Sequence, residues 1–159
     1  AWLSGQGLAV NVVNGGVSGD TTAGGAARIG WSLSDEIDAV IVTLGGNDML
    51  RGLPPAQARA NFEAIIDTAK SQQKPLMLLG MSAPLNYGEA YKQDFEAIYS
   101  ELTAEYKLPV APNVLAPLGE TPSEALKWMQ RDGVHPNAEG VELIVKTIGP
   151  DILRFLKGL

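Results

Sequence analysis

The sequence has no cysteine and only one histidine in 159 residues. Without cysteine the chain can form no disulfide, no thiolate metal site and no cysteine nucleophile. It also lacks any run of about 18 apolar residues, the length that a transmembrane helix needs. We therefore expect no membrane-spanning segment. With one imidazole and no carboxylates at ligand spacing, we also expect no metal site and no cofactor that depends on one.

Positive charge is scarce as well. There are 12 Lys and Arg residues against 18 Asp and Glu residues, which gives a formal net charge of −6. No basic cluster interrupts this balance, so nucleic acid is not an expected partner. A hydrophobic content of 45% indicates a folded chain rather than a disordered one. The length suits one core, so we predict a single domain over residues 1–159.

Short apolar runs alternate with amphipathic helical patterns along the chain. The runs predicted as strands are Leu8–Val13, Asp38–Leu44, Pro75–Gly80 and, more weakly because of its proline, Leu108–Ala111. Asp38–Leu44 is continuously apolar, which is typical of a strand buried on both faces of a parallel sheet. This alternation predicts βαβ units and an α/β fold in which helices cover a parallel sheet.

The helical patterns fill the spaces between these runs. After an apolar turn at Ala1–Leu3, helices are predicted over about 22–33, from Pro55 onward, over about 88–107, near 123–128, and after Asn137. Thr21 or Thr22 can cap the first of the long helices. Gly149-Pro150 is expected to break or kink the last one.

Three clusters of glycine and polar residues follow strands or lie in the late loop. They are Asn14–Asp20, Gly45–Asp48 and Asp132–Asn137. In a parallel α/β sheet, functional loops lie past the carboxyl ends of the strands, so these clusters are expected to form one active site. Gly19 can offer an unobstructed backbone N–H and Asn47 a side-chain amide, and two such donors can stabilise an oxyanion.

His135 is the only side chain whose ordinary pKa lies near neutrality. Asp132 precedes it by three residues, and on a tight loop its carboxylate can bind one ring nitrogen and leave the other free to accept a proton. Each feature also has a plainer interpretation. The glycine-rich stretch can be a simple turn, and Asn47-Asp48 can be a capping pair. Arg28 and Arg51 can meet an anionic substrate or merely be solvated.

The three clusters together resemble known sequence blocks. Asn14-Gly-Gly-Val-Ser-Gly-Asp-Thr-Thr22, Gly45-Gly-Asn-Asp48 and Asp132-Gly-Val-His-Pro-Asn137 are similar to three of the four blocks of the SGNH (GDSL) hydrolases, over roughly residues 9–148. The likeness is greatest to the bacterial thioesterase, lysophospholipase and arylesterase subgroup. It implies a three-layer α/β/α, flavodoxin-like parallel sheet with strand order second, first, third, fourth, fifth.

The resemblance also implies roles for residues. Gly19 and Asn47 would donate to the oxyanion, His135 would be the general base and then the acid, and Asp132 would orient the imidazole. Acyl transfer to water through a serine ester would follow, without metal or cofactor, on a small acyl ester or thioester. The residues implied for the substrate pocket are Asp20, Arg51, Pro84, Asn86 and Tyr87.

One block of the family is not matched. No Gly-Asp-Ser-Leu tetrapeptide occurs, and Ser4 and Ser18 stand in the wrong places to be the family nucleophile. The family's first, central strand also has no counterpart here, because only seven residues precede Leu8. We therefore expect the serine and that strand on a separate or preceding segment of polypeptide. The alternative is a non-catalytic acyl-ligand-binding fragment or pseudoenzyme. Similar proteins are often exported, which suggests a periplasmic or secreted location.

Overall fold

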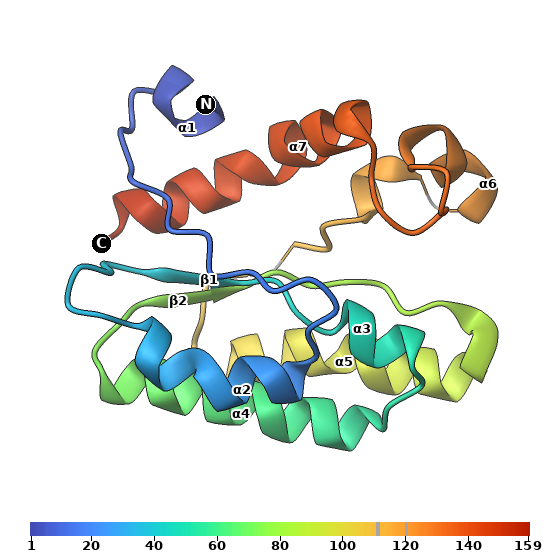
Figure 1. Cartoon of the computed structure of the whole chain (residues 1–159), viewed down its shortest axis with the longest axis horizontal. Coiled ribbons are helices and arrows are strands. Elements are labelled where there is room, and N and C mark those ends of the chain that lie inside the picture. The colour runs from blue at the N-terminus through green and yellow to red at the C-terminus, as the bar shows by residue number, and fades with distance from the viewer. Residues whose placement is uncertain (111, 120) are drawn as a thin grey trace. The chain divides into compact units, whose positions relative to one another are not determined.

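The computed structural model describes residues 1–110, 112–119 and 121–159 and is drawn in Figure 1. The chain divides into two compact units. The central unit is Val13–Ala111, and the terminal unit combines Ala1–Val12 with Pro112–Leu159. The expectation of one domain over the whole chain stays a prediction.

The central unit has the alternating α/β pattern that the sequence predicts. Its elements in chain order are α2 (Thr22–Ser32), β1 (Val40–Val42), α3 (Gly46–Leu50), α4 (Pro55–Ser71), β2 (Leu76–Leu78), the 3-10 helix η1 (Leu85–Tyr87) and α5 (Glu89–Tyr106). Thr21 caps α2 by accepting a hydrogen bond from the N–H of Gly24 at 3.5 Å. Pro55 opens α4, where a first-turn proline costs no hydrogen bond.

β1 and β2 form a short parallel sheet. Val40 pairs with Leu76, and Val42 pairs with Leu78. The N–H of Val40 donates to the Pro75 carbonyl, and the Val42 carbonyl accepts from Leu79. The backbone groups of Ile41 therefore point to the opposite edge of β1, because neighbouring residues of a strand alternate. That edge of β1 has no partner strand among the described residues.

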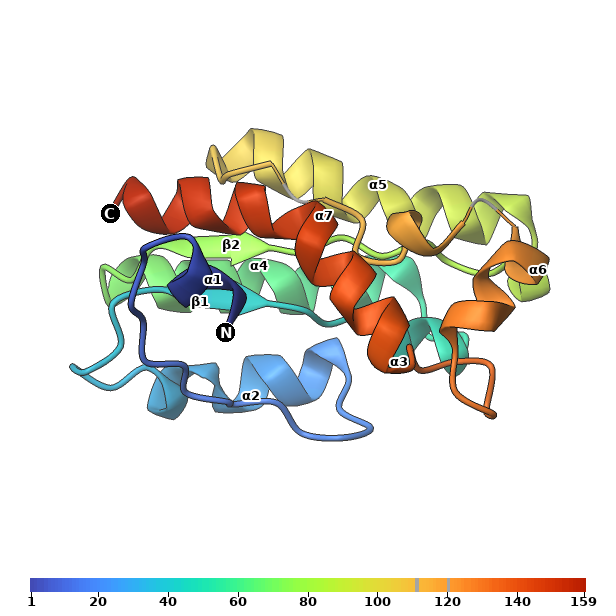
Figure 2. The same ribbon diagram turned by 90° about the horizontal axis from the view of Figure 1, so that it is seen from above.

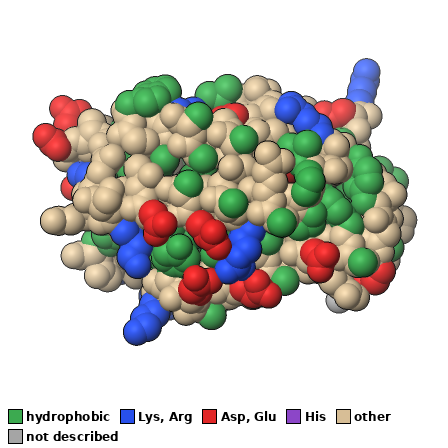
Figure 3. Space-filling view, turned by 90° about the horizontal axis from the view of Figure 1, so that it is seen from below, with side chains coloured by type: hydrophobic (Ala, Val, Ile, Leu, Met, Phe, Trp, Pro, Cys, Tyr) green, Lys and Arg blue, Asp and Glu red, His purple; other side chains and the backbone are tan. Residues whose placement is uncertain are grey.

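The helices of the central unit bury their apolar stripes as predicted. On α4 and α5 the buried residues are Ala58, Phe62, Ile65, Ile66, Ala69, Phe95, Ile98, Tyr99 and Leu102. Phe62 and Tyr99 meet edge to face with ring centroids 5.5 Å apart. Each buried aromatic or large aliphatic side chain adds about 1.5–3 kcal/mol over leaving it in water. Seen from below Figure 1, acidic and basic side chains lie beside one another on the surface (Figure 3). Among the ion pairs of this unit, Arg59 is bridged to Glu101 at 2.7 Å.

Three strand predictions need correction. Leu8–Val13 forms no strand, and Val12 and Val13 are exposed. A strand needs a neighbour to satisfy its backbone groups, and the only sheet described is the pair β1–β2. Asp38–Leu44 shortens to three residues and is not buried on both faces, because Ile41 is 38% exposed.

The last predicted strand, Leu108–Ala111, is irregular over residues 108–110, and Ala111 lies outside the described residues. α5 ends with Lys107 in the left-handed conformation (φ 54°), and the N–H of Leu108 turns back to the Thr103 carbonyl at 2.9 Å. Pro109 lacks a ladder donor. These features direct the chain into a helix-terminating turn rather than a strand.

The terminal unit is built around one long helix. It contains α1 (Trp2–Gly5), η2 (Ala116–Leu118), α6 (Pro122–Ala125), η3 (Leu126–Trp128) and α7 (Ala138–Lys157). The ring of Trp2 packs against Gly149 so closely that a Cβ there would lie 2.8 Å from it. α7 runs through Gly149-Pro150 without a break but changes direction along its length (Figure 2). The expected break at Gly149-Pro150 is therefore wrong, and a kink at these residues stays a prediction. No described helix combines the length and apolarity that crossing a bilayer requires.

Candidate active site

The loop before α7 brings Asp132 and His135 together. Nδ1 of His135 lies 2.8 Å from Oδ2 of Asp132. The other carboxylate oxygen, Oδ1, accepts the N–H groups of Val134 at 2.9 Å and of His135 at 3.0 Å. Gly133 allows this path with φ 67°, a conformation that other residues rarely adopt. The predicted contact between the carboxylate and the imidazole is therefore present.

The three hydrogen bonds have an electrostatic consequence. They lower the pKa of Asp132 to about 2. The N–H of His135 has the largest effect, followed by the N–H of Val134 and then the His135 ring. The carboxylate is therefore ionised at neutral pH and holds a proton on Nδ1 of the ring. Nε2 has no hydrogen-bond partner in the described part of the chain, and the His135 side chain is 70% exposed. This nitrogen is consequently free to accept a proton from a neighbouring group.

The His135 loop is closed by bonds at its base. Met129 and Pro136 form an antiparallel bridge, and the N–H of Gln130 donates to the His135 carbonyl at 2.7 Å. Asn137 caps α7 by accepting from Gly140, and its amide donates to the Lys127 and Met129 carbonyls at 2.9 and 3.2 Å. The start of a helix after Asn137 was predicted, but the bonds back to η3 and the part played by Gln130 were not.

In the central unit, Gly19 lies in a four-residue turn. The N–H of Asp20 donates to the Val17 carbonyl at 3.2 Å, and Gly19 has φ 78°. Glycine is favoured at this third position of a type II turn, since its φ must be positive. Gly19 is exposed, and its own N–H donates to no acceptor among the described residues. It therefore keeps the free donor that an oxyanion hole needs.

Asn47 lies in the first turn of α3, which follows β1 after a short loop. Its Nδ2 donates to the Asp20 carbonyl at 2.9 Å, so its side chain lies against the turn that contains Gly19. Gly45 makes the sharp entry to α3 with φ 105°, and a Cβ there would lie 2.3 Å from the hydroxyl of Tyr99. The two predicted donors, Gly19 and Asn47, thus belong to one locally connected site.

Asp48 follows Asn47 and is almost completely buried. Its Oδ2 accepts the N–H of Thr22 at 2.9 Å, and its Oδ1 accepts the Thr22 hydroxyl at 2.6 Å. Asn61 of α4 donates to the same hydroxyl oxygen at 2.9 Å. The carboxylate thereby fastens the N-terminus of α2, where negative charge is favoured, to α3. This network was not foreseen, and the only sequence signal for it is the Asp that follows Asn47.

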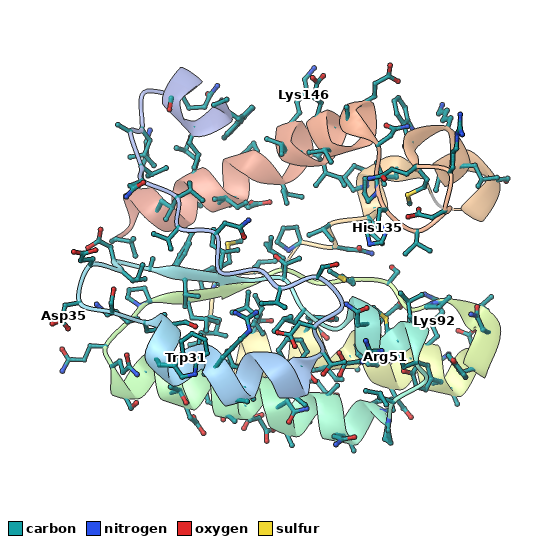
Figure 4. All side chains as sticks on the ribbon, in the orientation of Figure 1. Trp31, Asp35, Arg51, Lys92, His135 and Lys146 are labelled. Carbon is teal, nitrogen blue, oxygen red and sulfur yellow. The ribbon has the colours of Figure 1, made fainter. Side chains whose placement is uncertain are left out.

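The remaining predicted pocket residues differ in their surroundings. Arg51 follows α3 (Figure 4) and donates to the Gly19 carbonyl at 2.8 Å. Asp20 is ion-paired with Arg28 at 2.8 Å, so neither of the two side chains is simply solvated. The hydroxyl of Tyr87 reaches the Leu50 carbonyl at 3.3 Å.

Two further residues of that predicted pocket, Pro84 and Asn86, lie at and beside η1. Pro84 is partly buried and Asn86 is exposed. Their role in a pocket stays a prediction. Within the described ranges, no group of three or more His, Asp or Glu side chains is arranged to hold a metal ion.

Comparison with known proteins identifies the family. The model of the GDSL-like lipase/acylhydrolase family matches residues 1–143. This chain belongs to that family. The resemblance noted from the three sequence blocks is thereby confirmed, and so is the SGNH hydrolase fold class.

Several members of the family are similar in sequence. Esterase TesA of Pseudomonas aeruginosa is 35% identical over 94% of this chain and 73% of its own length. Thioesterase 1/protease 1/lysophospholipase L1 of Escherichia coli is 36% identical over 84% of this chain. The match spans 63% of that protein's length, less than two thirds. An arylesterase of Vibrio mimicus is 32% identical over 95% of this chain and 74% of its own length.

Solved structures agree with the family. The crystal structure of TesA superposes with a TM-score of 0.84 at 35% identity, covering 97% of this chain and 84% of the other. AlinE4, an esterase of the SGNH-hydrolase family, gives 0.74 at 37% identity, covering 96% and 80%. By their names, these GDSL relatives hydrolyse carboxylic esters or thioesters.

Proposed function

We propose that this GDSL-family chain supplies the base and the oxyanion donors of a serine-type hydrolase that acts on acyl esters or thioesters. The observation that carries the proposal is the contact between Asp132 and His135, which fixes the ring and leaves Nε2 free. Family membership and the unbonded N–H of Gly19 support it. The imidazole and the two donors must act on the same substrate carbonyl, and this requirement is part of the proposal.

In the proposed reaction, Nε2 of His135 removes the proton of a serine hydroxyl as its oxygen attacks the acyl carbon. The carbonyl oxygen becomes an oxyanion, which accepts hydrogen bonds from Gly19 and Asn47. The imidazolium, stabilised by Asp132, returns the proton to the departing alcohol or thiol. Water then attacks the acyl-serine in the same way: His135 takes a proton from the water, the oxyanion forms again, and the proton passes to the departing serine oxygen, which releases the acid and restores the serine.

The nucleophile is the unmatched part of this scheme. The family block Gly-Asp-Ser-Leu is absent from the sequence. We propose that the serine is contributed by a segment outside these 159 residues. Ser18 neighbours Gly19 in the donor turn and is not assigned this role, so Ser18→Ala is expected to leave turnover unchanged. Abolished turnover with an intact fold would instead assign Ser18 to the chemistry.

A fluorophosphonate probe, which labels activated serines, tests the proposal. The protein expressed from its own gene is treated, and intact masses are measured under denaturing conditions. A label on a species heavier than, or distinct from, the 16.8 kDa chain supports a serine on another segment. A label on the 16.8 kDa chain would show that one of its own serines reacts. No label on a folded protein would contradict hydrolase activity.

The missing block also favours a second candidate function. A chain without a nucleophile can be a pseudoenzyme that binds an acyl ligand and performs no chemistry. His135→Ala distinguishes the two candidates. In a hydrolase the substitution abolishes turnover, whereas in a binding protein it leaves the affinity for an acyl ligand nearly unchanged and there is no turnover to lose.

A further inference from the structure

The geometry of α3 gives Arg51 a specific relation to the oxyanion donors. Asn47 lies in α3, and Arg51 is the residue that ends it, four positions later and still in the right-handed helical conformation, so the two side chains leave the same side. Asn47 donates to the Asp20 carbonyl at 2.9 Å, and Arg51 donates to the Gly19 carbonyl at 2.8 Å. One short helix therefore holds two successive carbonyl groups of the donor turn.

The orientation of the Gly19 N–H depends on the form of this turn. In types I and II the central peptide, here between Ser18 and Gly19, points in opposite directions. That peptide carries the Gly19 N–H. Glycine adopts φ values of either sign at little cost, so Gly19 by itself does not select one form. The observed φ of 78° is one of the forms open to glycine, so contacts from outside the turn can stabilise it.

Arg51 provides the contact nearest to the donor. Its guanidinium is the only side chain in the described residues that bonds to Gly19. Arg28 also reaches the glycine-rich stretch, but its partners are the Gly15 carbonyl and the Asp20 carboxylate. The backbone N–H of Arg51 donates to the Asn47 carbonyl at 3.2 Å, which ties the arginine to the second donor.

We propose that Arg51 is a positioning residue: by holding the Gly19 carbonyl, it keeps the Gly19 N–H in the orientation that stabilises an oxyanion. Arg51 then need not touch the substrate, in contrast to the pocket role implied by family resemblance. The catalytic consequence rests on the proposed function, whereas the structural consequence does not. The two can therefore be tested separately.

The structural test is NMR of the ¹⁵N-labelled protein expressed from its own gene. The amide signal of Gly19 is assigned by its disappearance in Gly19→Ala. In Arg51→Met we expect this signal to shift or split, because the N–H is no longer held in one orientation. Arg51→Lys, which keeps one charged donor, should recover most of the wild-type signal. Arg59→Met is the matched control, because Arg59 pairs with glutamates of α4 and α5 and does not contact the turn.

A Gly19 signal in folded Arg51→Met that coincides with the wild-type signal would overturn the proposal. So would an equal change in Arg59→Met, because the effect would then be general. If Arg51→Met does not fold, Arg51→Gln replaces it under the same criteria. Thermal unfolding of each variant separates a local change in the turn from loss of the fold.

The catalytic test uses the serine-containing protein with an aryl or acyl-thiol ester. We expect Arg51→Met to lower kcat about tenfold or more with KM within about twofold, and Arg51→Lys to recover part of the loss. Complete loss of one oxyanion donor typically costs 10²–10³ in kcat, which sets the upper limit. An effect on KM alone would assign Arg51 to substrate binding and overturn the positioning role. If wild type itself shows no turnover while Gly19 responds to Arg51→Met, the proposed function fails and the positioning role stands.

Discussion

The His135 loop and the Gly19 turn are organised in opposite ways. Asp132 binds groups two and three residues away in the sequence, and its side chain is 47% exposed. The Gly19 turn is held by Asn47 and Arg51, which lie 27 and 32 residues from their partners. Behind it, Asp48 is buried against Thr22. The base is thus arranged by its own loop, whereas the donors are arranged by neighbouring elements.

This difference indicates where substitutions should act. Removing a side chain from the exposed loop before α7 should affect chemistry while leaving stability nearly unchanged, because little is buried there. Removing one from the network around α3 should affect position, stability or both. The proton-transfer pair and the donor pair can therefore be separated experimentally even though the proposed reaction needs both.

The largest expected effect belongs to His135→Ala. In the serine-containing protein we expect kcat/KM for an ester substrate to fall by about 10³–10⁶, as when the base of a catalytic triad is removed. The free energy of unfolding should change by less than about 0.5 kcal/mol, since the ring is 70% exposed. Steady-state kinetics and urea denaturation measure the two quantities. Retained activity would exclude His135 as the base.

Asn47→Ala should have the next largest effect. It removes one proposed oxyanion donor and also the bond to the Asp20 carbonyl at 2.9 Å. We expect kcat to fall about 10²–10³-fold with a smaller change in KM. Gln93→Ala, an exposed amide on α5, is the control and should be neutral. If only KM changed, Asn47 would be a binding residue and not a transition-state donor.

The sequence predicted the parts of the fold and site that depend on local pattern. The buried stripes of α4 and α5 follow from helical periodicity, and the contact of Asp132 with His135 follows from a three-residue spacing around Gly133. Gly19 and Asn47 could be identified as candidates because each lies in a loop that follows a predicted strand. That the two residues form one donor site became visible only from the contacts between α3 and the Gly19 turn.

The predictions that failed concern contacts between residues that are distant in the sequence. Leu8–Val13 has the composition of a strand, but a strand forms only beside another one, and in the part of the chain that the structure describes no strand is paired with it. Asp48 and Asn61 carry no pattern that reveals their meeting at Thr22, 26 and 39 residues away. Arg51 was associated with the substrate by resemblance, and its bond to the Gly19 carbonyl became visible only with the fold.

Asp48→Ala tests the buried hydrogen-bond network behind the Gly19 turn. The substitution leaves the buried N–H and hydroxyl of Thr22 without their acceptor. Each unsatisfied buried group costs about 1–3 kcal/mol of stability. We expect the free energy of unfolding to fall by about 2–5 kcal/mol in urea denaturation. Asp48→Asn keeps one acceptor and should lose about half as much. Asp94→Ala, on the exposed face of α5, should change stability by less than about 0.5 kcal/mol.

Acid titration of Asp132 should give the smallest effect, and it tests directly which hydrogen bonds hold the His135 loop. Its folded pKa is lowered from 3.8 to about 2, so its bonds stabilise the loop above pH 3.8 and are lost as the pH falls through 2. The amide NMR signals of Val134 and His135 should therefore show an acid transition with a midpoint near pH 2. In His135→Ala the midpoint should rise but remain below 3.8, because the two backbone bonds lower the pKa more than the ring does. A midpoint restored to 3.8 would instead make the ring the main partner of Asp132. The loop would then depend on the very side chain that it is proposed to position.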